Sequence, residues 1–404
     1  MISESLKYQR KELELKSLLE ITQAINENKT AEVLLHIFKF TCLVHLNIRS
    51  LVLYGKEAAS FTKLISHGLS GTVPSRLAEK QISHDREQGQ LNIEVGEEQS
   101  FEELELFVPV YHKQELLAIL LLKRKDANAP IDLDFTKALT NILVVALENK
   151  RFAKRQLEQE RLRKEVEIAS SVQRMLFPEV LPYTETLRAM VTYYPHSTVG
   201  GDYYDLIWPE PQTVYFCVAD VSGKGMPAAL LMSNFQAALR TLLRSFTDMR
   251  QIVEQLNATA YDSTKGERFI TFFLGRFSFS DRELTFVNAG HNPPLLSIPS
   301  TGSCEELSAG TTILGAFESL PFLEIGTRRV PESFHLHLYT DGLTEVLNPA
   351  EEEFGEERFH AFVREMCRLE PKDFHTRFLE VLNAFSAGTP RRDDLTLLSV
   401  ELPA

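Results

Sequence analysis

Five aspartates could carry chemistry, because each lies beside a segment whose residue pattern predicts a β-strand. These strand-like runs are DYYDLIW after Asp202, TVYFCVAD up to Asp220, FHLHLYTD up to Asp341, and DDLTLLSVEL from Asp393 and Asp394. A single aspartate at a strand end is usually a simple turn residue. Several aspartates at strand ends, each flanked by Gly, Asp or Thr and not by a partner lysine, indicate a shared site. Carboxylate oxygens without His or Cys suit Mg²⁺ or Mn²⁺ and disfavour zinc.

The segment around Pro211 predicts how the first two aspartates come together. The intervening PEPQ is turn-like, because Pro209 and Pro211 are excluded from a sheet interior. A hairpin symmetric about Pro211 places Asp202 opposite Asp220, with Cβ atoms about 4.5 to 5.5 Å apart. Two carboxylates that close repel each other strongly unless a cation lies between them. The sequence therefore predicts a cation at the open end of this hairpin.

The segments that position these aspartates predict an α+β domain. Strand-like runs dominate from residue 181 onward, and helical patterns interrupt them at 227–246, 249–261 and 357–382. Strands grouped with strands and helices grouped with helices indicate antiparallel sheets.

The N-terminal part reads as helices, a strand, a hairpin and a further helix from Phe135. Thr30 is expected to cap the second helix. The stretch DLDFT at 132–136 has the Asp-x-Asp-x-Thr spacing of an aspartyl phosphatase nucleophile, yet no buried strand precedes it. We interpret Asp132 or Asp134 as a helix cap.

The segment 149–178 is rich in both signs of charge and contains neither Gly nor Pro before Pro178. Leu162, Val166, Ala169, Val172 or Gln173, and Leu176 follow a three-four repeat, which favours a short parallel coiled coil between two chains. A solvated single helix is the alternative. We expect a helical linker that makes the protein a homodimer.

Composition limits the function classes. The chain has 404 residues and a net charge of −13, which argues against nucleic-acid binding, because that needs a basic face. The longest apolar run, 116–122, is far shorter than the roughly 20 residues of a membrane span. Four scattered cysteines without a Cys-x-x-Cys pair indicate reduced thiols. We expect a cytoplasmic protein without a membrane span.

Six ordered blocks carry a family resemblance: VGGDYYDL, VADVSGKGMPAALLMS, FITFFLGRF, VNAGHNPPLL, LYTDGLTEV and RRDDLTLLSVEL. Over residues 165–402 they closely resemble the bacterial metal-dependent serine/threonine phosphatases of the PPM superfamily, in the group that regulates sigma factors in stress responses and sporulation. The resemblance implies a β-sandwich flanked by helices over 179–404. It also implies a phosphorylated protein substrate of the anti-sigma-factor antagonist type.

The same resemblance implies roles for individual residues. Two divalent ions, Mn²⁺ or Mg²⁺, would be held by Asp202 and Asp220, with Asp220 bridging both ions. The implied further ligands are the Val221 carbonyl, Asp341 and Asp393, with Asp394 as the alternative or as a phosphate contact. Lys224 could approach the phosphate or be a surface cation. We interpret His291 as a loop residue rather than a proton donor. No arginine closely precedes Asp202, so the additional grip on the phosphate stays open.

Residues 1–148 resemble a GAF sensory domain, mainly through the order of their predicted elements and the stretch FVPVYHKQELLAILLL. Ala118 stands where many such domains have Gly, and the signature of cyclic-nucleotide-binding members is absent. The resemblance implies either an unknown ligand or a dimerisation platform with none. A signal there is expected to act on the helix after Pro227 through the linker.

Two other functions are compatible with parts of the sequence. The stretch GGDYYD also resembles the turn of diguanylate cyclases, but a charged helix occupies the region where the first metal-binding strand of such an enzyme should lie. That hypothesis also leaves the DGLTE and RRDD blocks unexplained. A catalytically silent phosphatase-like binding module is the second alternative, and the intact aspartates argue against it.

Overall fold

The computed structural model describes residues 2–69, 73–85, 90–93, 101, 104–112, 115–126, 131–330 and 333–403. The chain forms two compact units, Met1–Arg161 and Leu162–Ala404. Each is described by itself below.

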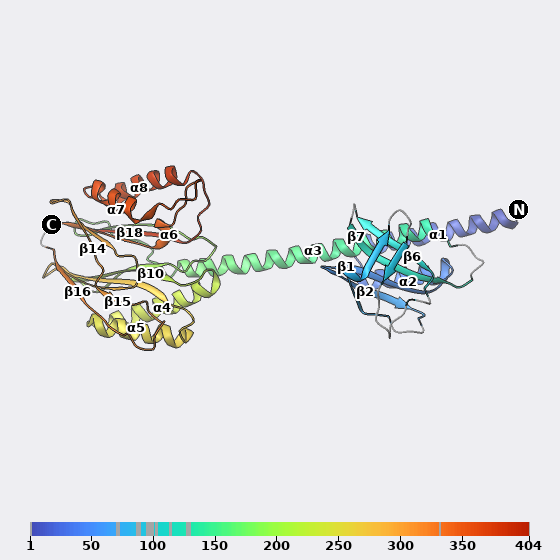
Figure 1. Ribbon diagram of the computed structural model, residues 1–404, viewed down its shortest axis with the longest axis horizontal. Helices are drawn as coiled ribbons and strands as arrows, with labels where there is room; N and C mark the ends of the chain where they lie inside the picture. Colours follow the sequence, from blue (N-terminus) through green and yellow to red (C-terminus); the bar gives the residue numbers. More distant parts are fainter. Residues whose placement is uncertain are drawn as a thin grey trace. The chain divides into compact units, whose positions relative to one another are not determined.

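An antiparallel sheet of five strands in the order β3-β2-β1-β7-β6 organises the N-terminal unit (Figure 1). Its strands are β1 (Ile48–Glu57), β2 (Ser60–His67), β3 (Arg76–Ala78), β6 (Leu106–His112) and β7 (Glu115–Arg124), and β4 (Ile82–Asp85) and β5 (Gln90–Ile93) form a separate hairpin. The helices are α1 (Ile2–Asn26), α2 (Ala31–His45), the 3₁₀ turn η1 (Glu79–Gln81) and the first part of α3 (Leu133–Arg174).

The central strand β1 is buried on both faces. Leu51 and Leu53 belong to the core shared with the helices, whereas Val52 and Tyr54 pack in a second cluster on the other face. This alternation follows from the period of two along a strand. The predicted strands are confirmed, and the tip of the predicted hairpin at Lys113 and Gln114 lies outside the described residues.

Two predicted caps explain where the helices of this unit begin. The Thr30 hydroxyl accepts the Val33 backbone N–H at the start of α2. Asp132 Oδ1 accepts the Phe135 N–H at 3.0 Å, so this aspartate is a helix cap and the nucleophile reading of DLDFT is wrong. From this cap α3 runs for 42 residues and ends at Arg174. The predicted linker 149–178 is thus mostly the later part of a longer helix.

The C-terminal unit is a sandwich of two sheets. The first contains β9 (Tyr203–Glu210), β10 (Thr213–Val221), β11 (Ile270–Ser278), β12 (Glu283–Ala289), β15 (Gly310–Thr311) and β16 (Gly326–Arg329). The second contains β8 (Arg188–Tyr194), β13 (Leu295–Ile298), β14 (Ser303–Glu306), β17 (Phe334–Tyr339) and β18 (Leu395–Leu402). Among the described residues of this unit, every pairing of these strands is antiparallel except that of β12 with β15.

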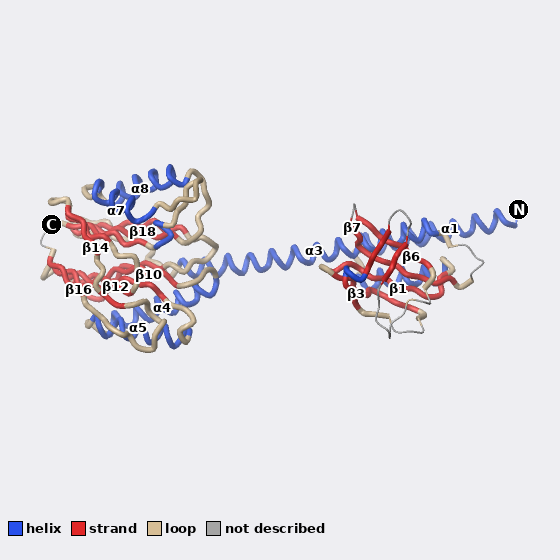
Figure 2. Tube along the Cα trace, in the orientation of Figure 1, coloured by secondary structure: helices blue, strands red, loops and turns tan. Residues whose placement is uncertain are grey.

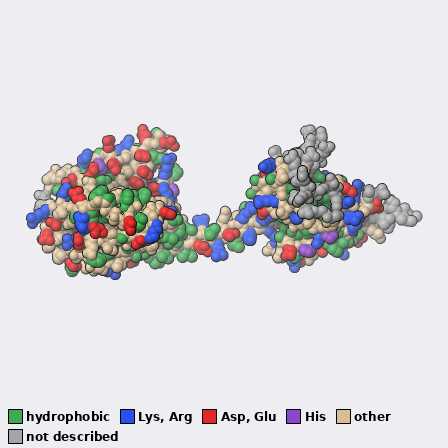
Figure 3. All heavy atoms as spheres, turned by 60° about the horizontal axis from the view of Figure 1, so that its bottom comes forward, with side chains coloured by type: hydrophobic (Ala, Val, Ile, Leu, Met, Phe, Trp, Pro, Cys, Tyr) green, Lys and Arg blue, Asp and Glu red, His purple; other side chains and the backbone are tan. Residues whose placement is uncertain are grey.

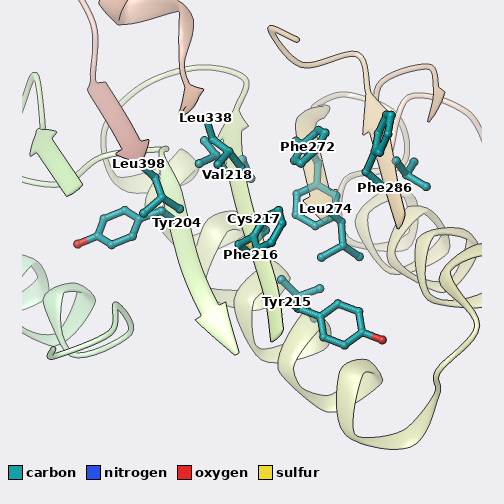
Figure 4. Packing of buried hydrophobic residues seen from close by; sticks show 14 of the residues in the cluster. Tyr204, Tyr215, Phe216, Cys217, Val218, Phe272, Leu274, Phe286, Leu338 and Leu398 are labelled. Carbon is teal, nitrogen blue, oxygen red and sulfur yellow. The ribbon is translucent and has the colours of Figure 1, made fainter. Parts of the chain in front are cut away.

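Helices cover both outer faces of the sandwich, as Figures 1 and 2 show. One pair is α4 (Met226–Ser245) and α5 (Met249–Thr264); the other is α7 (Gly355–Met366) and α8 (Pro371–Ser386), and the single turn α6 (Asp341–Thr344) follows β17. Between the sheets, Val218 of β10 lies next to Leu338 and Leu398 of the second sheet (Figure 4). The predicted α+β class with antiparallel sheets is confirmed.

One predicted helix is two helices. The pattern over 357–382 is interrupted, because α7 ends at Met366 and α8 starts at Pro371. A proline cannot donate the N–H that a continuous helix needs, but it suits the first turn of a new one.

The surface of the C-terminal unit on the side of α4 and α5 is mixed in character (Figure 3). Among the exposed large apolar side chains of this unit are Leu230 of α4, Phe317 and Phe322. Among the described residues, no helix is long and apolar enough to cross a membrane.

Candidate functional site

The β9–β10 hairpin has the register that its sequence predicts. Tyr203 pairs with Ala219 and Leu206 with Phe216, so paired residues are related symmetrically about Pro211. Near the turn the register shifts by one residue, which leaves the open end unaffected. Continuing the pairing one step beyond Tyr203 places Asp202 opposite Asp220.

Asp202 is buried and held by the hydroxyl groups of Thr340, which directly follows β17, and of Thr396 in β18. Its Oδ2 accepts hydrogen bonds from Thr340 Oγ1 at 2.9 Å and from Thr396 Oγ1 at 2.5 Å. Burial and then the neighbouring Asp220 carboxylate raise the pKa of Asp202 well above its ordinary value, although both threonine bonds lower it. A carboxylate in this position needs a nearby positive charge to ionise readily.

Asp220 brings the other aspartates into one cluster. Its pKa is raised first by burial and then by the charges of Asp341, Asp393 and Asp394, whereas a hydrogen bond with Asp202 lowers it. Burial and Asp393 also raise the pKa of Asp341. These mutual effects show that aspartates from four separate segments meet at one end of the sandwich. We call these five residues the acidic cluster.

Three glycines leave room at the acidic cluster. A Cβ on Gly201 would lie 2.9 Å from the Val221 carbonyl oxygen and 3.6 Å from Asp220 Oδ1. A Cβ on Gly342 would overlap the Asp394 carbonyl oxygen at 1.8 Å, and one on Gly200 would lie 2.6 Å from Asp394 Oδ2. Only glycine permits this close approach of backbone and carboxylate groups.

Asp394 and Lys224 have different surroundings from those expected of phosphate contacts. Both oxygens of Asp394 accept backbone N–H groups at 2.6 Å, from His196 and from Gly201, so this side chain fastens the loop that carries Asp202. Lys224 Nζ lies 2.7 Å from Asp393 Oδ2 and donates to the Arg392 carbonyl. The lysine thus balances part of the charge of the acidic cluster itself.

The donor set of the acidic cluster fits hard divalent cations. Its oxygens come from carboxylates and one nearby backbone carbonyl, which are ligands that Mg²⁺ and Mn²⁺ prefer. Within the part of the chain that the structure describes, no three acidic, His or Cys side chains already close around one point as a metal shell. The residues therefore form an open cluster of repelling carboxylates whose charge Lys224 balances only in part.

Gln173, near the end of α3, contacts the loop of the acidic cluster. Its amide donates to the Gly200 carbonyl at 2.8 Å and accepts the Gly200 N–H at 3.2 Å. The apolar repeat predicts either Val172 or Gln173 at a coiled-coil seam, and nothing in the sequence indicates that Gly200 is the partner of Gln173.

Asp205 has a structural role despite its place in GGDYYD. It is fully buried and accepts two hydrogen bonds from Arg240 of α4, at 2.8 and 3.1 Å, and a third from Tyr203. This pair fastens α4 to β9. Arg188, the nearest upstream arginine, is engaged with Glu370 and Glu401 and does not supply the missing phosphate grip.

His291 is buried next to β11. Its Nδ1 lies 2.8 Å from Thr271 Oγ1, and its backbone N–H donates to Asn288. Burial lowers its pKa to about 4, so the imidazole is neutral at pH 7. A neutral, buried ring agrees with a structural part in this loop.

The C-terminal unit is a helix-flanked β-sandwich with aspartates gathered at one end. Residues 210–403 match the family model described as Stage II sporulation protein E (SpoIIE).

Two curated bacterial proteins resemble part of the chain. Phosphoserine phosphatase RsbU of Bacillus subtilis (strain 168) is 27% identical over 187 residues, which are 46% of this chain and 55% of that protein. Phosphoserine phosphatase RsbP of the same organism is 25% identical over 186 residues, or 45% of each. The chain spans about half the length of the curated relatives it matches.

Among solved structures, the SiaA-PP2C domain of Pseudomonas aeruginosa has a TM-score of 0.54 with 21% sequence identity. The similarity covers 60% of this chain and 97% of that domain. It supports the fold of the C-terminal unit.

Proposed function

We propose that the protein is a metal-dependent phosphatase that removes phosphate from serine or threonine side chains of a protein substrate. The observation that carries the proposal is the acidic cluster, in which burial and neighbouring carboxylates raise the pKa values of Asp202, Asp220 and Asp341. Such a cluster is costly without cations and becomes favourable with them. The PPM-type fold and the two similar phosphoserine phosphatases support the same conclusion.

In this proposal Asp202 and Asp220 hold two divalent ions, Mn²⁺ or Mg²⁺. The Val221 carbonyl, Asp341 and Asp393 complete the ligands. When bound, such ions stabilise charge on the phosphoryl oxygens and activate the attacking water.

The remaining residues of the site have supporting roles. Thr340 and Thr396 orient the Asp202 carboxylate, because both hydroxyls donate to the same oxygen. Asp394 keeps the Gly201 loop in place. Lys224 pairs with Asp393 in the structure, and we propose that it turns toward the substrate phosphate once a metal ion neutralises that aspartate.

The substrate and its regulation are finer parts of the proposal. The similarity to RsbU and RsbP supports a phosphorylated signalling protein of the anti-sigma-factor antagonist type as the substrate. We further propose that residues 1–148 are a GAF-like sensory unit and that 149–178 pair with a second chain. The exposed apolar side chains Leu162, Ile168 and Val172 of α3 support this pairing.

The proposal is tested by phosphate release from a generic aryl phosphate and from a phosphoserine protein, with and without Mn²⁺. Wild type should release phosphate only with the metal, and Asp220→Asn should lose at least about a hundredfold in rate. Asp262→Asn is the matched control, because Asp262 is an exposed aspartate of α5 whose recorded ion pair is with Lys265. It should behave like wild type.

The alternatives predict other results. A silent binding module would bind the phosphorylated partner without metal-dependent release from wild type. Equal rates for wild type and Asp220→Asn would refute the proposed role of the acidic cluster.

A further inference from the structure

A second polar site lies at the opposite end of β10 from the acidic cluster. There, a cavity of about 170 Å³ opens between the first sheet and the C-terminal end of α4. Its polar lining includes Arg244, Arg276, Thr213, Ser245 and Thr247. Thr213 is the first residue of β10, whereas Asp220 lies near the last, so this cavity is separate from the candidate phosphatase site.

Arg276 is the central feature of this cavity. It lies on β11 directly opposite Tyr215 of β10. Its Nε atom is buried and has no hydrogen-bond partner. A buried guanidinium N–H without an acceptor is costly, and such groups in native proteins usually have a protein, water or ligand partner.

Tyr215 forms the wall beside Arg276. Figure 4 shows its hydroxyl directed away from the other labelled core side chains. Burial raises the pKa of Tyr215, whereas the positive charge of Arg276 and a side-chain hydrogen bond with Arg276 act in the opposite direction. The hydroxyl therefore stays protonated at neutral pH and can donate a hydrogen bond.

The charge of the cavity favours an anion. Glu210 is its only acidic lining residue, and among the described ion pairs neither Arg244 nor Arg276 takes part. The carbonyl end of α4 also faces this region and disfavours an anion, but Arg244 lies in that last turn and opposes the effect. Two guanidinium groups thus outweigh one carboxylate.

We propose that this cavity, the Arg276 pocket, binds a small oxyanion of the phosphate class. The planar guanidinium group matches the oxygen spacing of phosphate and can donate two parallel hydrogen bonds. The hydroxyl of Thr213, a buried residue of the lining, supplies a further donor, whereas the Ser245 hydroxyl already donates to the Thr241 carbonyl. The volume equals that of roughly five or six water molecules, which is enough for one tetrahedral oxyanion.

The site requires neither the metal ions nor the acidic cluster, so its test can be separated from phosphatase activity. The full chain is titrated with inorganic phosphate in EDTA at constant ionic strength, with chloride as the reference anion, and binding is followed by calorimetry. Without metal the acidic cluster repels phosphate and contributes no binding.

Wild type should bind phosphate in preference to chloride. Arg276→Gln should weaken binding at least about tenfold. Arg244→Gln should weaken it to a smaller extent, because this side chain is exposed at the rim. Arg329→Gln, an exposed arginine of β16, is the matched control and should bind like wild type. A parallel titration with O-phosphoserine distinguishes a free anion from a phosphorylated side chain, and binding of either supports the pocket.

Equal binding of phosphate and chloride by wild type would overturn the proposal, as would unchanged phosphate affinity in a folded Arg276→Gln variant. If circular dichroism shows that Arg276→Gln does not fold, Arg244→Gln decides the question in the same titration. Phosphate-soaked, metal-free crystals with the anion elsewhere than in the Arg276 pocket would also refute it.

Discussion

Replacing Thr396 by valine tests how the second sheet tunes the acidic cluster. The substitution keeps the shape of the side chain and removes only the hydroxyl that donates to Asp202 Oδ2 at 2.5 Å. Thr340 still donates to the same oxygen. Asp202 therefore loses one of two hydrogen bonds that favour its charged form.

The expected effect follows from the energy of that bond. A hydrogen bond to a charged group contributes about 1.5 to 3 kcal/mol, and one pKa unit corresponds to about 1.4 kcal/mol. The already raised pKa of Asp202 should therefore rise further. Because a metal must displace the proton, Mn²⁺ affinity below that pKa should fall about tenfold to a hundredfold.

The assay is calorimetric titration of Mn²⁺ into the full chain between pH 6 and 9. The affinity curve of Thr396→Val should be displaced toward higher pH relative to wild type. Thr259→Val is the control, because the Thr259 hydroxyl bonds only the preceding turn of α5 on the surface. Coincident curves for wild type and a folded Thr396→Val variant would refute this account of the site.

Three further predictions concern the loop, its anchor and the buried histidines. Gly201→Ala should fold but lose at least about tenfold in Mn²⁺ affinity by calorimetry, since its Cβ would crowd the Val221 carbonyl at 2.9 Å; unchanged affinity would contradict the close approach. Gln173→Leu should lower the free energy of unfolding by about 1 to 3 kcal/mol in urea, because the Gly200 backbone groups lose both partners, whereas exposed Gln251→Leu should not. Burial lowers the pKa of His335 to about 4 and that of His375 to about 3. As the pH falls below 6.5, the unfolded chain takes up these protons before the folded chain does. Each histidine should therefore lower the free energy of unfolding by about 1.4 kcal/mol per pH unit. In metal-free protein the raised pKa values of the acidic cluster make the folded chain more stable as the pH falls, which is the opposite effect. The difference in the free energy of unfolding between wild type and His375→Gln, followed from about pH 6.5 to about pH 5, isolates the contribution of this histidine. Parallel curves of unfolding free energy against pH for the two proteins would exclude that contribution.

The sequence by itself determined the features that depend on neighbouring residues. Thr30 and Asp132 cap their helices because the bonded N–H groups lie three residues away. The β9–β10 register followed from the prolines of the turn and the alternating pattern on either side, which together predicted Asp202 opposite Asp220. The helix break at Pro371 was missed, although the proline itself was the signal.

Only the tertiary structure decided which distant side chains support those aspartates. The donors to Asp202 are 138 and 194 residues away along the chain, and Gly201 is 193 residues from Asp394. Such partners depend on how two sheets pack face to face, which no local pattern specifies. Tertiary packing also gives Asp393 and Asp394 different roles, because neighbouring residues at a strand end can face different surroundings. The unpartnered Nε of Arg276 became visible only when β10, β11 and the end of α4 came together.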